Sequence, residues 1–301
     1  MDLSFYKLRV CDADLILVDD LGGNGRDRDW PALSRALLHR RRGAGADRLA
    51  VLARAEGDTW LRVFGAAGEG GPLADAALCA ARYLLDSGRS GAERVCLRAS
   101  GGLSLEVDVL DSASLGLSLG PPRRAAAGAS ADGTEARDME TLGESESASA
   151  RAASAAALRS PEEAAALGAL IESGAARYQV LPLRVGLPGA DGLAVFAEGA
   201  ASPARVRAEA GGAAAAVAVR VVSRTELRAQ AQRGFALDAA AAGSLALAAA
   251  AALGRSERGA MVRLGSGALW VEWGSRGALY AVGRPEYVYR GEFHWLEPSG
   301  G

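Results

Sequence analysis

Residues 60–109, WLRVFGAAGEGGPLADAALCAARYLLDSGRSGAERVCLRASGGLSLEVDV, recur in outline at residues 226–273, ELRAQAQRGFALDAAAAGSLALAAAAALGRSERGAMVRLGSGALWVEW. Each copy carries Leu-Arg at the start of a strand, then a glycine-containing loop, a helix of small residues, a Gly-Arg-Ser turn and two strands joined by glycines. Leu61 and Leu227 are 166 residues apart, as are Gly88 and Gly254. An internal repeat of this kind predicts two homologous lobes.

The second-copy helix is apolar nearly all round, so it needs burial on every side. We therefore expect an α+β protein in which each lobe is a curved, mostly antiparallel sheet or barrel around a central helix. The loops at 65–75 and 234–243 each lead into the start of such a helix. Two helix N-termini that face each other across the lobe boundary would form a cleft that attracts anions such as a carboxylate.

The repeat and the changes in composition suggest three segments. We expect an N-terminal lobe at 1–110, to which the C-terminal strand at 283–301 returns, and a C-terminal lobe at 161–282. Between them, residues 111–160 are rich in Ala, Ser, Gly, Glu and Arg. Almost no large apolar side chain is available there to offset the entropy of ordering, so we expect a flexible low-complexity insertion.

The composition argues against nucleic-acid binding and against a membrane span. Half of the 301 residues are hydrophobic and the formal net charge is −2, which gives no electrostatic footprint for nucleic acid. The start of the chain lacks the pattern of a secretory signal, and the mostly alanine run at 239–253 is shorter than the roughly 20 apolar residues of a membrane span. We expect a cytoplasmic protein with neither nucleic acid nor membrane as its partner.

The residues that bind metals and cofactors are scarce. The chain has three cysteines without paired spacing, Cys11, Cys79 and Cys96, and two histidines, which predicts neither a disulfide framework nor a metal site. The glycine-rich FGAAGEGG at 64–71 lacks the Gly-Lys-Ser or Gly-Lys-Thr ending of a phosphate loop. No cofactor is expected.

Four segments resemble the diaminopimelate epimerase family. FYKLRVCDADLILVDD at 5–20 resembles F-x-K-M-x-G-x-G-N-D-F-x-x-x-D, and HRRRGAGADRLAVL at 39–52 resembles R-x-x-G-x-G-A-D-G. QRGF at 232–235 resembles E-R-G-V, and GRPEYVYRGEF at 283–293 resembles G-P-A-x-x-V-F-x-G-E. The matching positions include Lys7, Asp14, Asp19, Gly43, Gly45, Ala46 and Asp47. The resemblance implies a two-lobed, cofactor-independent amino-acid isomerase of lysine biosynthesis.

Both catalytic cysteines of that family are missing. The family removes the α-proton with one thiolate and delivers a proton from the opposite face with the other thiol. Its motif C-G-N-G-x-R-C corresponds to LADAALC at 73–79, which puts Leu73 at the first cysteine. Its motif A-C-G-T-G-A corresponds to AAAGSL at 240–245, which puts Ala241 at the second, or Ala242 after a one-residue slip. The family's asparagines are replaced as well, for example by Ala13 and Gly65.

A few polar residues remain near the two helix starts. By the resemblance, Arg233, Gly234, Gly243 and Ser244 are the candidate ligand-binding residues. Arg233 could pair with a ligand carboxylate, or it could hold the lobe interface through backbone carbonyls. Two alternatives are open for Asp75 and Asp238, which are either a substitute acid–base pair or helix caps. Cys79 is either a relocated base or a buried small residue.

These losses favour a diaminopimelate epimerase-like protein without two-cysteine epimerase activity, a pseudoenzyme that acts as a binding or regulatory relative. Its expected partners are a small amino-acid or carboxylate ligand, a second copy of the chain, or an active paralogue. The alternative is a cofactor-independent amino-acid isomerase that uses the altered acid and base groups. The aromatic residues at 270–289 are expected to pack within sheets, with a dimer surface as the alternative.

Overall fold

The computed structural model describes residues 2–23, 28–91, 93–124, 169–173, 176–184, 191–197, 215–231 and 237–295. Its helices are α1 (Trp30–Leu38), α2 (Ala74–Asp86) and α6 (Ala239–Ala252), with a short 3₁₀ turn at Ser100–Gly102. The strands are β1 (Asp2–Val10), β2 (Ala13–Asp20), β3 (Arg48–Ala55), β4 (Asp58–Gly65), β5 (Gly68–Glu69), β6 (Arg94–Ala99), β7 (Leu103–Val109), β8 (Leu115–Gly120), β9 (Arg123–Arg124), β10 (Ala169–Ser173), β11 (Ala176–Arg184), β12 (Asp191–Ala197), β13 (Ala215–Ser223), β14 (Glu226–Ala231), β15 (Gly259–Leu264), β16 (Gly267–Trp273), β17 (Leu279–Gly283) and β18 (Glu286–His294).

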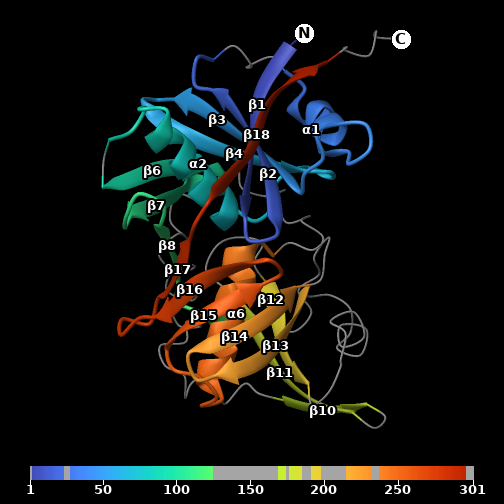
Figure 1. The fold of residues 1–301 in the computed structure, drawn as a ribbon, viewed down its shortest axis with the longest axis vertical. Helices are drawn as coiled ribbons and strands as arrows, with labels where there is room; N and C mark the ends of the chain where they lie inside the picture. The colour runs from blue at the N-terminus through green and yellow to red at the C-terminus, as the bar shows by residue number, and fades with distance from the viewer. Residues whose placement is uncertain are drawn as a thin grey trace, which may run out of the picture.

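The strands divide between an upper and a lower lobe (Figure 1). The upper lobe contains β1–β7, and the lower lobe contains β10–β17. Strand β8 pairs with β7 on one side and with β17 on the other, so the sheet is continuous from lobe to lobe. Most pairs are antiparallel, and the parallel ones are β2–β3, β4–β6, β12–β13 and β14–β15. The α+β class expected from the sequence fits this arrangement.

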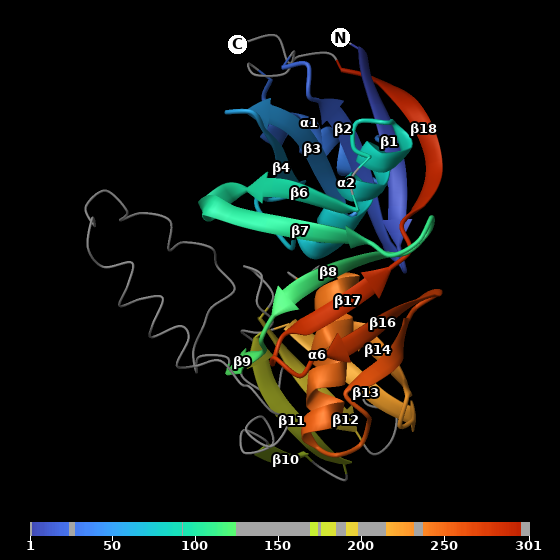
Figure 2. The ribbon, with the colours of Figure 1, turned by 90° about the vertical axis from the view of Figure 1, so that its left-hand side faces the viewer.

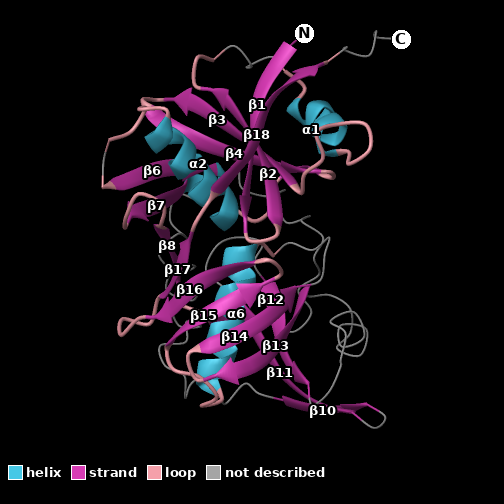
Figure 3. Ribbon diagram, viewed as in Figure 1, coloured by secondary structure: helices cyan, strands magenta, loops and turns pink. Residues whose placement is uncertain are grey.

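The repeat corresponds to the same connection in both lobes. Strand β4 leads through α2 to a parallel neighbour, β6, which forms an antiparallel hairpin with β7. Strand β14 leads through α6 to a parallel neighbour, β15, which forms an antiparallel hairpin with β16. Strands surround each of the two helices (Figure 3). Helix α2 contacts β1–β4, β7 and β8, and helix α6 contacts β11–β17.

Helix α6 is buried along its whole length, as its composition predicts. All fourteen of its residues are buried, including Ser244. Alanine has little side chain to lose entropy on folding and favours the helix, and its small volume lets the surrounding strands approach the helix axis closely. Helix α2 has the same place in the upper lobe, but part of its last turn reaches solvent.

A second core lies on the other face of the upper sheet, beneath α1. Asp29 begins this helix by accepting a hydrogen bond from the N–H of Ala32 at 2.9 Å. Trp30, Leu33 and Leu37 then pack against the sheet, where the Trp30 and Phe64 rings are stacked. Strand β18 completes this lobe by pairing antiparallel with β1, which brings Asp2 beside His294 at the top of the view in Figure 1.

One sequence expectation differs from the structure. Leu115–Gly120 and Arg123–Arg124, which were expected to belong to the insertion at 111–160, form strands β8 and β9, and the alternate leucines of β8 are buried in the core. Residues 125–168 lie outside the described residues. Among the helices that the structure describes, none is both long and apolar enough to cross a membrane.

Candidate functional site

Helices α2 and α6 meet N-terminus to N-terminus at the boundary between the lobes. In Figure 2, α6 stands upright in the lower lobe, and one of its ends lies beside the upper lobe, where α2 lies. The two helices contact each other, and the loops that precede them are the ones that the repeat singled out. This boundary is where the sequence placed the candidate site.

Two aspartates cap these helices across the boundary, and we call them the interlobe capping pair, Asp75 and Asp238. Asp238 Oδ2 accepts hydrogen bonds from the N–H groups of Ala74 at 2.8 Å and Asp75 at 3.0 Å, both in α2. Asp75 Oδ2 and Oδ1 accept from two N–H groups of the opposite helix, Ala239 at 2.7 Å and Ala240 at 3.0 Å. Each carboxylate therefore occupies the N-terminus of the helix in the other lobe.

Asp238 also caps its own helix, because its Oδ1 accepts from the N–H of Ala241 at 2.9 Å. In total, five backbone N–H groups that would be free at helix starts point to the protein's own carboxylates. A helix N-terminus binds a ligand anion through the same N–H groups. At this boundary those N–H groups already donate to the carboxylates of Asp75 and Asp238.

Burial raises the pKa of both members of the capping pair. The pKa of Asp75 is well above its ordinary value, first because the carboxyl is buried and second because Asp238 is nearby. The pKa of Asp238 is raised by burial, while the hydrogen bonds that it accepts and the charge of Arg48 oppose the rise. The backbone N–H groups of Ala239 and Ala240 likewise stabilise the charged form of Asp75.

Arg48 is a member of the site that sequence reasoning missed. It begins β3, and its guanidinium lies over the loop that leads into α2. A Cβ on Gly65 would sit 2.9 Å from Nη1 of Arg48, and a Cβ on Gly71 would sit 3.3 Å from Nε. Its charge favours the ionised form of Asp238. In the sequence, Arg48 directly follows Gly-Ala-Asp at 45–47. Only the folded structure brings its charge near Asp238.

The two positions that the sequence resemblance aligned with the family's cysteines are apolar and buried. Leu73 is the N-cap residue of α2 and is 7% exposed, and Ala241 is the third residue of α6 and is 1% exposed. Cys79 is buried in α2, and burial followed by the charge of Asp75 raises its thiol pKa well above the ordinary value. A thiol with a raised pKa stays protonated, so Cys79 is a poor base.

Gly243 and Ser244 are internal to α6. A Cβ on Gly243 would meet Leu264, Leu269 and Val271 at 3.4–3.5 Å, so this glycine faces β15 and β16. The Ser244 hydroxyl is buried and has no hydrogen-bond partner among the residues that the structure describes. Arg233 and Gly234 lie outside the described residues.

The family-like positions that this chain keeps serve the scaffold. Lys7 Nζ donates to the carbonyl of Gly45 at 2.7 Å and pairs with Asp14 at 3.2 Å. Asp47 accepts from the N–H of Asp14 at 3.0 Å. Asp19 accepts from the Tyr83 hydroxyl at 2.6 Å. These contacts tie β1, β2, the turn before β3 and helix α2 together, and none involves the capping pair.

Two other contacts join the lobes. Asp12, in the β1–β2 turn, accepts from the N–H and the hydroxyl of Ser266 at 2.8 and 2.7 Å. The Tyr280 hydroxyl on β17 donates to Asp108 on β7 at 2.9 Å. Cys11 lies in the same turn as Asp12 with a φ of 54°, and burial, with smaller effects from Asp75 and Asp12, raises its thiol pKa to about 12.

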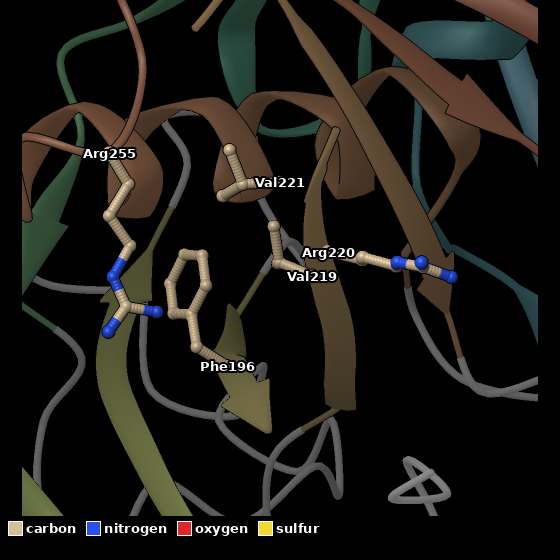
Figure 4. A pocket seen from close by; sticks show the side chains of 5 residues that line it. All are labelled: Phe196, Val219, Arg220, Val221 and Arg255. Carbon is tan, nitrogen blue, oxygen red and sulfur yellow. The ribbon is translucent and has the colours of Figure 1, made fainter. Parts of the chain in front are cut away.

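The described surface has a hollow of about 430 Å³ far from the capping pair. It lies beside Phe196, Val219, Val221 and Arg255, and Figure 4 shows the Arg255 guanidinium over the Phe196 ring while Arg220 points away. The Arg255 guanidinium carbon is 4.9 Å from the ring centroid. Arg255 follows the C-terminal end of α6, a helix about 20 Å long, so this hollow is not part of the boundary site.

Solved structures share this fold. A phenazine biosynthesis protein of the PhzF family from Bacillus anthracis is 10% identical with a TM-score of 0.62, over 98% of this chain and 100% of that one. A hydroxyproline epimerase from Agrobacterium vitis with bound trans-4-hydroxy-L-proline is 13% identical with a TM-score of 0.59, over 97% and 91%. Methylitaconate-delta-isomerase is 12% identical with a TM-score of 0.54, over 99% of each chain.

No protein-family model and no curated protein sequence matches this chain significantly. At 10–13% identity the structural likeness establishes the fold. The chain therefore has the fold of PhzF-like and proline-racemase-like isomerases, which is related to the fold expected from the sequence. The three structures named above are not diaminopimelate epimerases, so the narrower family is left to the proposal that follows.

Proposed function

We propose that this chain is a diaminopimelate epimerase-like protein whose interlobe reaction site has become a structural joint, and that it acts as a non-catalytic binding or regulatory protein. One observation carries the proposal. The helix N-termini that would hold a substrate carboxylate are capped by Asp75 and Asp238 from opposite lobes. A substrate anion would have to displace a covalently attached carboxylate that is already in place.

The residues at the reaction positions support the same conclusion. Inversion at an α-carbon needs an acid and a base on opposite faces, and Leu73 and Ala241 provide neither. Cys79 is buried with a raised thiol pKa. What the chain keeps, as at Lys7 and Asp14, holds strands together. The partner that suits a rigid two-lobed protein without a reaction site is a second copy of the chain or an active homologue.

The test is exchange of the α-proton into deuterated solvent. LL- and meso-diaminopimelate, and trans-4-hydroxy-L-proline, would each be incubated with the protein at high concentration. Deuterium at Cα should not exceed the no-protein control when it is followed by NMR or mass spectrometry. Exchange above that control would contradict the non-catalytic proposal.

The capping pair favours one alternative, an isomerase in which Asp75 and Asp238 exchange protons with a substrate. Two carboxyls from opposite lobes with raised pKa values resemble the paired acids of other enzymes. That alternative predicts exchange that disappears in both Asp75→Asn and Asp238→Asn and survives in Asp58→Asn. Asp58 is a suitable control because it is an exposed carboxylate of the upper lobe.

A further inference from the structure

A second hollow lies on the upper lobe, between α1 and the end of β18. Its volume is about 450 Å³, within the range of small-molecule sites. One wall is formed by Arg35, His39 and Arg42, and Ala32 and Ala36 of α1 add small apolar surface. Phe293 and Trp295 supply the aromatic part. The hollow is separate from the capping pair, so its role does not depend on the proposed function.

The aromatic residues form a platform. The rings of Phe293 and Trp295 are stacked, with centroids 6.2 Å apart and an angle of 27° between the planes. Both side chains are only partly buried, so each keeps part of its surface in contact with solvent. Flat unsaturated rings stack on such surfaces.

The basic residues present hydrogen-bond donors to the hollow. Arg35 and Arg42 are exposed, and neither forms an ion pair with a carboxylate in the part of the chain that the structure describes. His39 Nδ1 accepts from the N–H groups of Arg41 and Arg42, each at 3.1 Å. In neutral imidazole the proton is then on Nε2, which makes Nε2 a donor. The wall therefore offers two guanidinium groups and one imidazole N–H.

The last carbonyls of α1 do not need Arg35 or Arg42 as hydrogen-bond donors. Basic residues at a helix C-terminus commonly satisfy its last carbonyls. In α1 those carbonyls already accept backbone N–H groups, Ala36 from His39, Leu37 from Gly45 and Leu38 from Ala46. Arg35 and Arg42 are thus available for an external anion.

From this combination we infer that the α1–β18 hollow binds a small planar aromatic anion, with its ring on Trp295 and its carboxylate or phosphate at Arg35 and Arg42. Guanidinium groups bind both anions through paired N–H donors. The two sources of such an anion are nucleotides and aromatic carboxylates. Both carry the chemistry that this hollow recognises.

Isothermal titration calorimetry of the full chain tests the assignment with two matched pairs of probes. Adenosine 5′-monophosphate is compared with adenosine, and 2-naphthoate with 2-naphthalenemethanol. At least one anion should bind saturably with a Kd below about 1 mM, and its neutral counterpart should bind at least about tenfold more weakly, since a charge-assisted hydrogen bond is lost. Whichever anion binds more tightly identifies phosphate or carboxylate as the preferred group.

Variants locate the site. Arg35→Gln and Arg42→Gln should each weaken the anion about tenfold, and Trp295→Leu should weaken it about tenfold through lost stacking. Arg54→Gln, which removes an exposed arginine of β3 on the same lobe, should leave binding unchanged. Thermal unfolding confirms that each variant is folded, and Arg35→Gln is an exposed change that should not disturb the fold.

Three results would overturn the assignment. The first is no saturable binding by either anion. The second is equal affinity for an anion and its neutral counterpart, or undiminished binding by both Arg35→Gln and Arg42→Gln. The third is binding of a ten-residue oligothymidylate more than about a hundredfold tighter than adenosine 5′-monophosphate, which would make the surface a nucleic-acid site.

Discussion

Replacing Asp75 by alanine should destabilise the protein by about 2 kcal/mol. The Asp75 carboxylate is 5% exposed and accepts hydrogen bonds from Ala239 and Ala240. Its removal leaves both donors at the α6 N-terminus without their partner. Each buried donor that loses its acceptor costs about 1–3 kcal/mol, which gives roughly 2–6 kcal/mol before any compensation.

The compensation comes from electrostatics. Burial and Asp238 both raise the pKa of Asp75, so removing this carboxyl also removes a desolvated acid and its repulsion with Asp238. This gain offsets part of the loss, and about 2 kcal/mol is the expected net result. Asp75→Asn should lose about half as much, because the amide keeps one oxygen that can accept an N–H.

The assay is urea unfolding followed by circular dichroism, with the free energy of unfolding taken from the linear dependence on urea. Asp58→Ala is the control, since it removes an exposed carboxylate that pairs with Arg98 at 3.1 Å. Exposed pairs of this kind contribute about 0–1 kcal/mol. If Asp75→Ala is no more destabilising than Asp58→Ala, the capping pair is not the joint between the lobes.

Three further predictions follow from single features. Because the pKa of Asp75 is raised in the folded state, the folded protein holds this proton more tightly than the unfolded chain, and the stabilisation that the proton gives is present below the ordinary value of 3.8 and lost as pH rises through the raised pKa; the stability of wild type relative to Asp75→Asn should therefore fall as pH rises above about 4 in urea titrations. Gly243→Ala should raise stability by about 0.5–1 kcal/mol, since alanine favours helix and its Cβ would make ordinary contacts at 3.4–3.5 Å; a lower Tm would show that the surrounding strands cannot accept a methyl group. In a thiol titration at pH 8, exposed Cys96 should react first and buried Cys79 only on unfolding, and equal rates for the two thiols would contradict the packing of α2.

Local sequence patterns predicted the central helices well and the boundary segments poorly. The alanine-rich run of α6 has no polar face, so burial on all sides was the only stable arrangement. Strand β8 was missed because Leu115–Gly120 alternate leucine with glycine and serine next to a low-complexity segment. Helix α1 was not predicted either, although Asp29 and Pro31 are ordinary signals of a helix start.

The candidate site could be located from the sequence but not described from it. The repeat identified both helix starts, and the family resemblance pointed to Leu73 and Ala241, where this chain has no thiol. An aspartate ordinarily caps its own helix, as Asp238 does by accepting a hydrogen bond from the N–H of Ala241. Nothing in a local pattern indicates that Asp75 caps a helix 164 residues away.

The sequence by itself therefore determined the duplicated lobes, the buried helices and the apolar residues Leu73 and Ala241 near the two helix starts, because these depend on residue type and on spacing along the chain. Only the tertiary structure decided how the two helix starts are used. Hydrogen bonds between Asp238 and α2, or between Asp75 and α6, depend on distances across the lobe boundary, and the same holds for the Arg48 charge beside Asp238. Electrostatic and hydrogen-bond energies depend on separation in space, which residue order does not specify.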